Sequence, residues 1–221
     1  MWRDMRLLDY ILDLIYPPRC VFCRKILAVG EKGICKKCVS LLPKLKADEC
    51  RRDVRNVKIC VFPFRYKDEV RASLLRYKFG GAAAYGPIYA DFIAKSIDEN
   101  GISCDIISWV PLHKKRLRER GYDQSEIIAR ALSKKLGVPC QRLLVKESRN
   151  KRQSSIANRE ERMANVSGVY RCVSKEDLLG KRVLLVDDII TSGATIGECA
   201  TMLKAFGCTE IYAAAFAAAR S

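Results

Sequence analysis

One run of the sequence, residues 183–195, constrains the fold more than any other part. Its apolar start predicts a buried strand, and we expect that strand to end at the neighbouring carboxylates Asp187 and Asp188, at the carboxyl edge of a parallel sheet. The residues that follow are small or carry hydroxyls and lead into a helix: Thr191, Ser192, Gly193, Ala194 and Thr195. Backbone N–H groups of such residues close around a phosphate at a helix N-terminus, and paired carboxylates accept hydrogen bonds from the vicinal hydroxyls of ribose. The run therefore predicts a sugar-phosphate site.

The rest of the chain alternates between strand and helix patterns. The expected strands cover residues 58–66, 105–110, 182–186 and 211–218. The expected helices cover residues 6–16, 68–79, 87–97, 124–136 and 196–206. This alternation predicts an α/β fold, in which helices flank a parallel sheet. Residues 146–166 are polar and show little periodicity, and a connection of that length is often a functional lid.

Four of the eleven cysteines form two CxxC pairs, Cys20/Cys23 and Cys35/Cys38, with eleven residues between the pairs. Two such turns facing each other supply the four thiolates of a tetrahedral zinc site, whereas a redox role usually needs only one CxxC. We expect a zinc module over residues 1–57 and a second domain over residues 58–221. The other cysteines have no paired spacing and are expected to be buried as small apolar residues: Cys50, Cys60, Cys104, Cys140, Cys172, Cys199 and Cys208.

The net charge of +16 is unevenly spread along the chain. Residues 111–171 contain 16 basic and 6 acidic side chains, and residues 1–60 contain 14 and 7. Such clustering favours contact with a polyanion, either a phosphate ligand or nucleic acid, although a solvated basic face is the plainer alternative. No stretch is long and apolar enough to span a bilayer, and we expect a cytoplasmic protein.

The basic segment begins where the strand expected over residues 105–110 ends. Lys115 and Arg116 suit contact with phosphate groups, and the single histidine, His113, is either a ligand contact or an ordinary surface residue. The candidates for nucleic-acid contact are Lys114, Arg118, Arg120, Arg149, Lys151, Arg152 and Arg159. Tyr77 and Tyr122 are candidates for stacking on bases, although an ordinary core or surface position is the plainer interpretation of each.

Residues 183–195 resemble the phosphoribosyl pyrophosphate (PRPP) signature of type I phosphoribosyltransferases. Three further segments, residues 75–81, 111–124 and 159–165, resemble motifs of the ComF family of competence proteins, and this resemblance covers essentially the whole chain. The resemblance implies a type I phosphoribosyltransferase fold that binds PRPP with Mg²⁺, behind an N-terminal zinc-finger module. It also implies a role in moving single-stranded DNA across the inner membrane, beside a helicase-like ATPase at the inner face of that membrane.

Several roles follow from the resemblance. Asp187 and Asp188 would hold the ribose hydroxyls, residues 191–195 the 5′-phosphate, and His113, Lys115 and Arg116 the pyrophosphate. The chain departs from the family where Lys114 follows His113 and where Asp123 precedes Gln124, since the usual residues there are proline and asparagine. The alternatives at this point are a transferase with an unnamed acceptor, a non-enzymatic DNA-uptake adaptor and a nucleobase-salvage enzyme.

Overall fold

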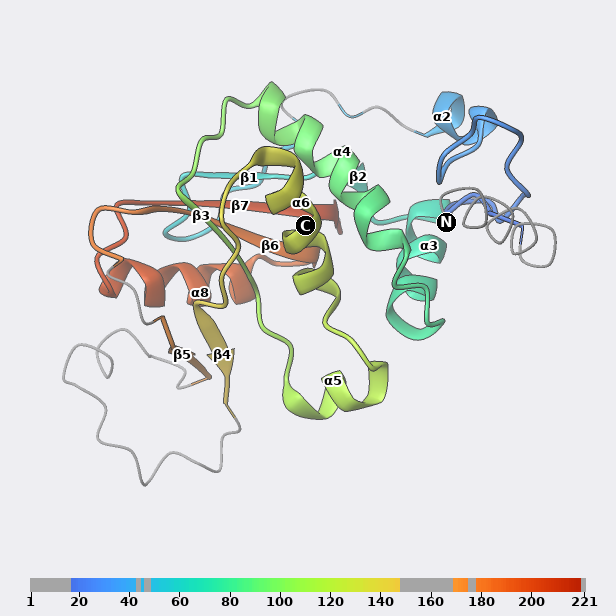
Figure 1. The fold of residues 1–221 in the computed structure, drawn as a ribbon. Coiled ribbons are helices and arrows are strands. Elements are labelled where there is room, and N and C mark those ends of the chain that lie inside the picture. Colours follow the sequence, from blue (N-terminus) through green and yellow to red (C-terminus); the bar gives the residue numbers. More distant parts are fainter. Residues whose placement is uncertain (1–16, 43–44, 46–48, 148–168, 175–177, 220–221) are drawn as a thin grey trace, which may run out of the picture.

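A computed structural model describes residues 17–42, 45, 49–147, 169–174 and 178–219, so the helix expected over residues 6–16 lies outside the described residues (Figure 1). The helices are α2 (Lys36–Leu41), α3 (Asp68–Phe79), α4 (Tyr85–Glu99), α5 (Lys114–Arg120), α6 (Gln124–Leu136) and α8 (Ala194–Ala205). The strands are β1 (Ile59–Val61), β2 (Phe64–Arg65), β3 (Ile106–Trp109), β4 (Leu144–Lys146), β5 (Tyr170–Cys172), β6 (Arg182–Ile190) and β7 (Glu210–Ala218). Among the described residues, none of the helices has both the length and the apolar character needed to cross a membrane.

The main sheet has the order β1-β7-β6-β3, and β2 also pairs with β7. All of these pairings are parallel, as the strand–helix alternation predicted. The strand expected over residues 58–66 is two short strands instead of one, because Pro63 lies between β1 and β2 and has no N–H group for the ladder.

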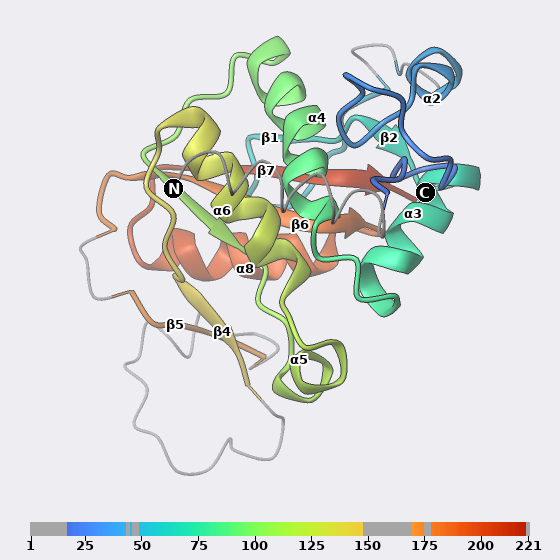
Figure 2. The same cartoon turned by 45° about the vertical axis from the view of Figure 1, so that its right-hand side comes forward.

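Alternate side chains of β6 enter two different cores. Leu184 and Val186 join the core beneath α4 and α6, while Val183 and Leu185 join the core beneath α8. Figures 1 and 2 show the same arrangement, with α8 on one face of the sheet and α4 and α6 on the other. The predicted parallel sheet flanked by helices is therefore confirmed, and its central strands are apolar on both faces because both faces are covered.

The expectation that the β6 strand ends at the acidic pair is wrong. β6 continues to Ile190, because its backbone keeps pairing with β7 through Ile189↔Ala217 and Ile190↔Ala218. The short helix α5 and the antiparallel pair β4–β5 were not expected. α5 has the sequence KKRLRER and so has almost no apolar periodicity to reveal it.

The cysteine-rich segment is fixed to the sheet domain through α3. Ser73 Oγ donates a hydrogen bond to the carbonyl of Val21 (2.6 Å), and Arg76 Nη2 donates to the carbonyls of Val21 (2.8 Å) and Phe22 (2.7 Å). The Phe22 ring lies in an aromatic cluster with Phe64 and Phe216, at centroid distances of 5.9 and 6.2 Å. The first CxxC turn is thus part of the main core.

Candidate functional site

A cavity of about 480 Å³ opens beside the carboxyl-terminal part of β6. Eight of the residues predicted for the site line it: Asp187, Asp188, Thr191, Thr195, His113, Lys115, Arg116 and Arg120. Five further polar residues that the sequence reasoning did not assign to the site also line it: Lys78, Gln124, Ser125, Lys146 and Tyr170. Five lysine and arginine side chains therefore surround two aspartates, which makes the cavity suited to an anion that also carries hydroxyl groups.

The two aspartates have different partners. Asp187 accepts hydrogen bonds from Ser125 Oγ (2.8 Å) and from the backbone N–H of Asp188 (2.8 Å). The Asp188 carboxylate forms an ion pair with Lys78 Nζ at 2.8 Å, and the two side chains are only 8% and 16% exposed. Burial, followed by the charge of Asp188, raises the pKa of Asp187. Ionised Asp187 is therefore costly in the folded protein and would gain from a ligand that donates hydrogen bonds or carries a cation.

The loop after β6 has the geometry of a phosphate cradle. Gly193 is the N-cap of α8 with φ +81°, a left-handed conformation that favours glycine, and Ser192 Oγ accepts from the N–H of Ala194 (3.3 Å). A Cβ at Gly193 would also lie 2.9 Å from Val54 Cγ2. Thr191 and Thr195 line the cavity, whereas Ser192, Gly193 and Ala194 shape the turn behind it.

Arg52 supports this loop from outside the cavity, a role that nothing in its local sequence indicates. Its guanidinium donates to the carbonyls of Ile190, Thr191 and Ala219. The ends of β6 and β7 are thereby joined to the segment that precedes β1. The Arg52 side chain holds the loop in place, and it is not among the residues that line the cavity.

The basic wall is formed by the end of β3 and by α5. His113 is the N-cap of α5, and its Nδ1 accepts from the N–H of Lys115 (3.2 Å). Asp123 joins this segment to α6, because Oδ2 accepts from the N–H of Leu112 (3.1 Å) while Oδ1 accepts from the N–H of Ser125 (3.1 Å). The carboxylate at this position thus makes the hydrogen bonds of a helix cap and also orders the loop before α5.

A third wall comes from the β4–β5 pair. Lys146 Nζ donates to Tyr170 Oη at 3.0 Å and lies 5.1 Å from the centre of the Tyr170 ring. Burial raises the pKa of Tyr170. Most of the lid expected over residues 146–166 lies outside the described residues.

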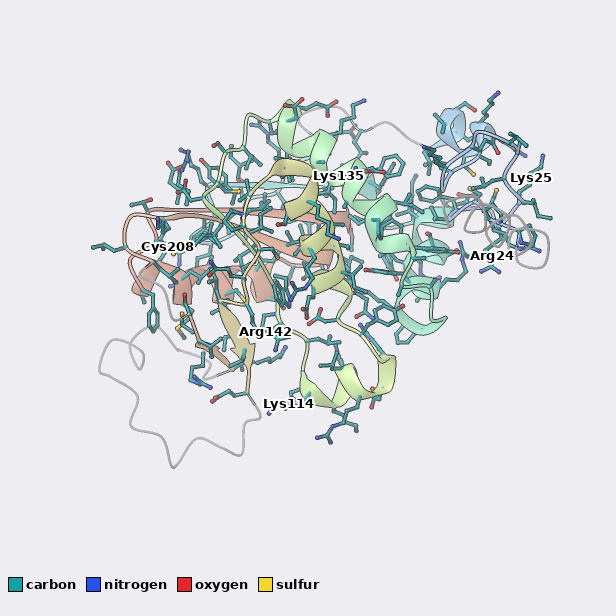
Figure 3. All side chains as sticks on the ribbon, viewed as in Figure 1. Arg24, Lys25, Lys114, Lys135, Arg142 and Cys208 are labelled. Atoms are coloured by element: carbon teal, nitrogen blue, oxygen red, sulfur yellow. The ribbon has the colours of Figure 1, made fainter. Side chains whose placement is uncertain are left out.

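The candidates for nucleic-acid contact lie in different surroundings. Arg120 lines the cavity, whereas Lys114 and Arg118 are exposed on α5 outside it. Figure 3 shows Lys114 at the end of α5, away from the sheet. Tyr77 is fully buried and offers no face for stacking, so of its two alternatives the structure supports an ordinary core residue. Four candidates lie outside the described residues: Arg149, Lys151, Arg152 and Arg159.

Cys20, Cys23, Cys35 and Cys38 form one cluster, as their spacing predicted. Their sulfur atoms all lie within 4.8 Å of one another, and three of the four side chains are buried. Four thiol groups at this separation match the donor set of structural zinc. Of the remaining cysteines, Cys60, Cys172, Cys199 and Cys208 are buried as expected. Cys50, Cys104 and Cys140 are only partly buried.

Models of two protein families match the chain. The phosphoribosyl transferase domain matches residues 123–221, and the double zinc ribbon domain matches residues 11–60. Among solved structures, an adenine phosphoribosyltransferase from Thermoanaerobacter pseudethanolicus covers 79% of this chain and 98% of its own at 18% identity, with a TM-score of 0.43. The family models, the parallel sheet and the cysteine cluster define a protein with a type I phosphoribosyltransferase fold and an N-terminal zinc ribbon.

Curated relatives specify the family further. Competence protein F of Haemophilus influenzae is 25% identical over 215 residues, which are 87% of this chain and 93% of the relative. Competence protein ComFC of Streptococcus pneumoniae is 27% identical over 186 residues (83% and 79%). The DNA utilization protein YhgH of Escherichia coli is 24% identical over 219 residues (90% and 96%). These relatives, together with the phosphoribosyl transferase and double zinc ribbon domains, support a ComF-family protein.

The cysteine cluster predicts one bound zinc ion for its four thiolates. Cys35→Ser should release that zinc and lower the melting temperature, because a structural zinc ion contributes directly to folding. Zinc content per chain and thermal unfolding measure the two effects. Cys104→Ser, at a partly buried cysteine outside the cluster, should keep the zinc, and full zinc content in Cys35→Ser would contradict the assignment.

The raised pKa of Asp187 predicts that this side chain reduces stability at neutral pH. When a carboxyl has a higher pKa in the folded than in the unfolded state, the folded protein loses stability as the pH rises from the unfolded-state pKa to the folded-state pKa. Asp187→Asn should therefore raise the melting temperature at pH 7.5, by about 2–4 °C per kcal/mol relieved, and the gain should shrink towards pH 5. Asp98→Asn, at an exposed site on α4, is the control. A lower melting temperature of Asp187→Asn at pH 7.5 would show that the ionised carboxylate is stabilising.

Proposed function

We propose that the cavity binds PRPP together with Mg²⁺, and that the protein uses this site while it handles single-stranded DNA in natural transformation. The observation that carries the proposal is the meeting of an acidic pair, a phosphate-type loop and a basic wall in one cavity. Each of these groups matches a different part of PRPP. The type I phosphoribosyltransferase fold supports the same ligand class.

The fit to PRPP can be stated group by group. The Asp187 and Asp188 carboxylates would accept hydrogen bonds from the ribose hydroxyls. The loop of residues 191–195, at the N-terminus of α8, would take the 5′-phosphate. His113, Lys115 and Arg116 would contact the pyrophosphate, where cations lower the cost of concentrated negative charge.

The donor set also suits Mg²⁺, which prefers carboxylate and phosphate oxygens. We propose that Asp187 holds the ion together with the pyrophosphate, since Asp188 is already paired with Lys78. When bound, the ion would offset the negative charge that builds on pyrophosphate as it leaves. The residues of the basic wall would share in that stabilisation.

The competence relatives support the link to DNA uptake, as do the basic residues Lys114 and Arg118 exposed beside the cavity. We propose a cytoplasmic protein that meets single-stranded DNA at the inner face of the membrane, next to a helicase-like ATPase. A phosphoribosyltransferase for a nucleobase in salvage is the alternative function. The zinc ribbon and the basic surface favour the role in DNA uptake.

PRPP with Mg²⁺ should stabilise the folded protein. At 100 times the Kd, the expected gain of about 2.7 kcal/mol corresponds to a rise in melting temperature of about 5–10 °C. Arg116→Gln should weaken PRPP binding by about 10- to 100-fold, because it removes a charged hydrogen-bond donor from the cavity wall. Calorimetric titration measures the Kd of PRPP for each variant. Arg71→Gln, at an exposed site on α3, is the matched control and should leave that Kd unchanged. If PRPP neither shifts the melting temperature nor releases heat with the wild-type protein, the proposal fails.

Binding of single-stranded DNA should depend on salt, because each neutralised phosphate releases counterions. The logarithm of the binding constant should fall linearly with the logarithm of the salt concentration, and Arg118→Gln should reduce the slope by about 0.7. Fluorescence anisotropy of a labelled thymidine oligonucleotide provides the measurement. Lys95→Gln, at an exposed lysine on α4, should leave the slope unchanged. If the affinity for single-stranded DNA does not change with salt concentration, the basic surface is not the DNA-binding site.

A further inference from the structure

Phe79 is the last residue of α3, and its side chain is 69% exposed. The two residues that follow it are glycines. Neither glycine has a side chain that could cover the ring. The exposed ring is thus available to a ligand.

Arg120 connects this ring to the cavity. Its guanidinium lies 5.0 Å from the centre of the Phe79 ring, and its Nη1 donates to Gln124 Oε1 at 2.9 Å. Arg120 and Gln124 both line the cavity. The guanidinium therefore lies over one face of the Phe79 ring and joins that ring to the cavity wall, and the exposed remainder of the ring is left for a base.

The position of the ring is fixed by the residue before it. Lys78 reaches into the cavity and pairs with Asp188, in a contact that is largely shielded from water. Phe79 cannot move far while that ion pair holds the end of α3. The aromatic ring consequently lies at the rim of the proposed sugar-phosphate site.

We propose that Phe79 and Arg120 form a stacking platform for a nucleobase whose sugar phosphate lies in or beside the cavity. This inference rests on the proposed function and names the second substrate class of that site. An aromatic face and an arginine plane are the surfaces on which proteins stack bases. A protein partner would need a wider apolar patch, whereas Phe79 is bordered by glycines and a cation. The base can belong to a free nucleotide or to the end of a DNA strand.

Three ligands separate the parts of this site: ribose 5-phosphate, thymidine 5′-monophosphate and a 5′-phosphorylated thymidine decamer. Phe79→Ala should weaken both base-bearing ligands by about 5- to 150-fold, the range that stacking on one aromatic residue covers. The same substitution should leave the Kd of ribose 5-phosphate within about twofold of the wild-type value, because that ligand has no base. Phe79→Trp should restore binding, and bound base should quench its added fluorescence. Phe206→Ala, at an exposed phenylalanine after the far end of α8, is the matched control.

The outcomes identify the source of the base and can overturn the inference. A loss confined to the monophosphate indicates a free nucleotide, and a loss confined to the decamer or shared by both indicates a strand end. The inference is wrong if Phe79→Ala changes neither, or if acrylamide cannot quench the added tryptophan, since the ring would then be covered. Either result leaves PRPP binding intact, whereas failure of PRPP to bind the wild-type protein would defeat the proposed function itself.

Discussion

The ion pair between Lys78 and Asp188 joins the parts of this molecule on which the site depends. Both charges are largely buried, and a buried charge is tolerated only when it is paired. Lys78 lies at the end of α3, and the same helix holds the first CxxC turn through Ser73 and Arg76. The zinc ribbon, α3 and the carboxyl-terminal part of β6 are therefore one connected unit. Among the described residues, α3 therefore contacts the first CxxC turn through Ser73 and Arg76 and contacts Asp188 through Lys78.

The cavity combines groups that are far apart in the sequence. Asp187, Asp188 and the loop after β6 form the part of the cavity that we propose for a sugar phosphate. α5 adds cations, and the β4–β5 pair adds Lys146 beside Tyr170. Arg52 and Asp123 keep the two loops in place from outside. The exposed Phe79 ring, in contact with Arg120, lies next to residues of the cavity wall. In the proposed site, the cavity would hold the sugar phosphate of a nucleotide and this ring would contact its base.

Much of the fold could be predicted from the sequence because its signals are local. The bounds of α3 and α6 follow from apolar periodicity that stops at Gly80 and Gly137, and the cysteine cluster follows from the spacing of two CxxC pairs. The end of β6 could not be predicted locally, because two neighbouring carboxylates are typical of a strand end, whereas pairing with β7 extends the strand to Ile190. The contacts of Lys78, Ser125 and Arg52 with the site could not be predicted. Each joins residues more than 60 positions apart, and no local pattern encodes such a pair.

We propose that the cavity beside β6 is a PRPP site, and a crystal structure grown with PRPP and Mg²⁺ would show where the ligand binds. We predict the 5′-phosphate against residues 191–195, the ribose hydroxyls on Asp187 and Asp188, and the pyrophosphate beside Lys115 and Arg116. A PRPP molecule bound elsewhere on the surface, or a cavity that stays free of it at saturating concentration, would contradict the account.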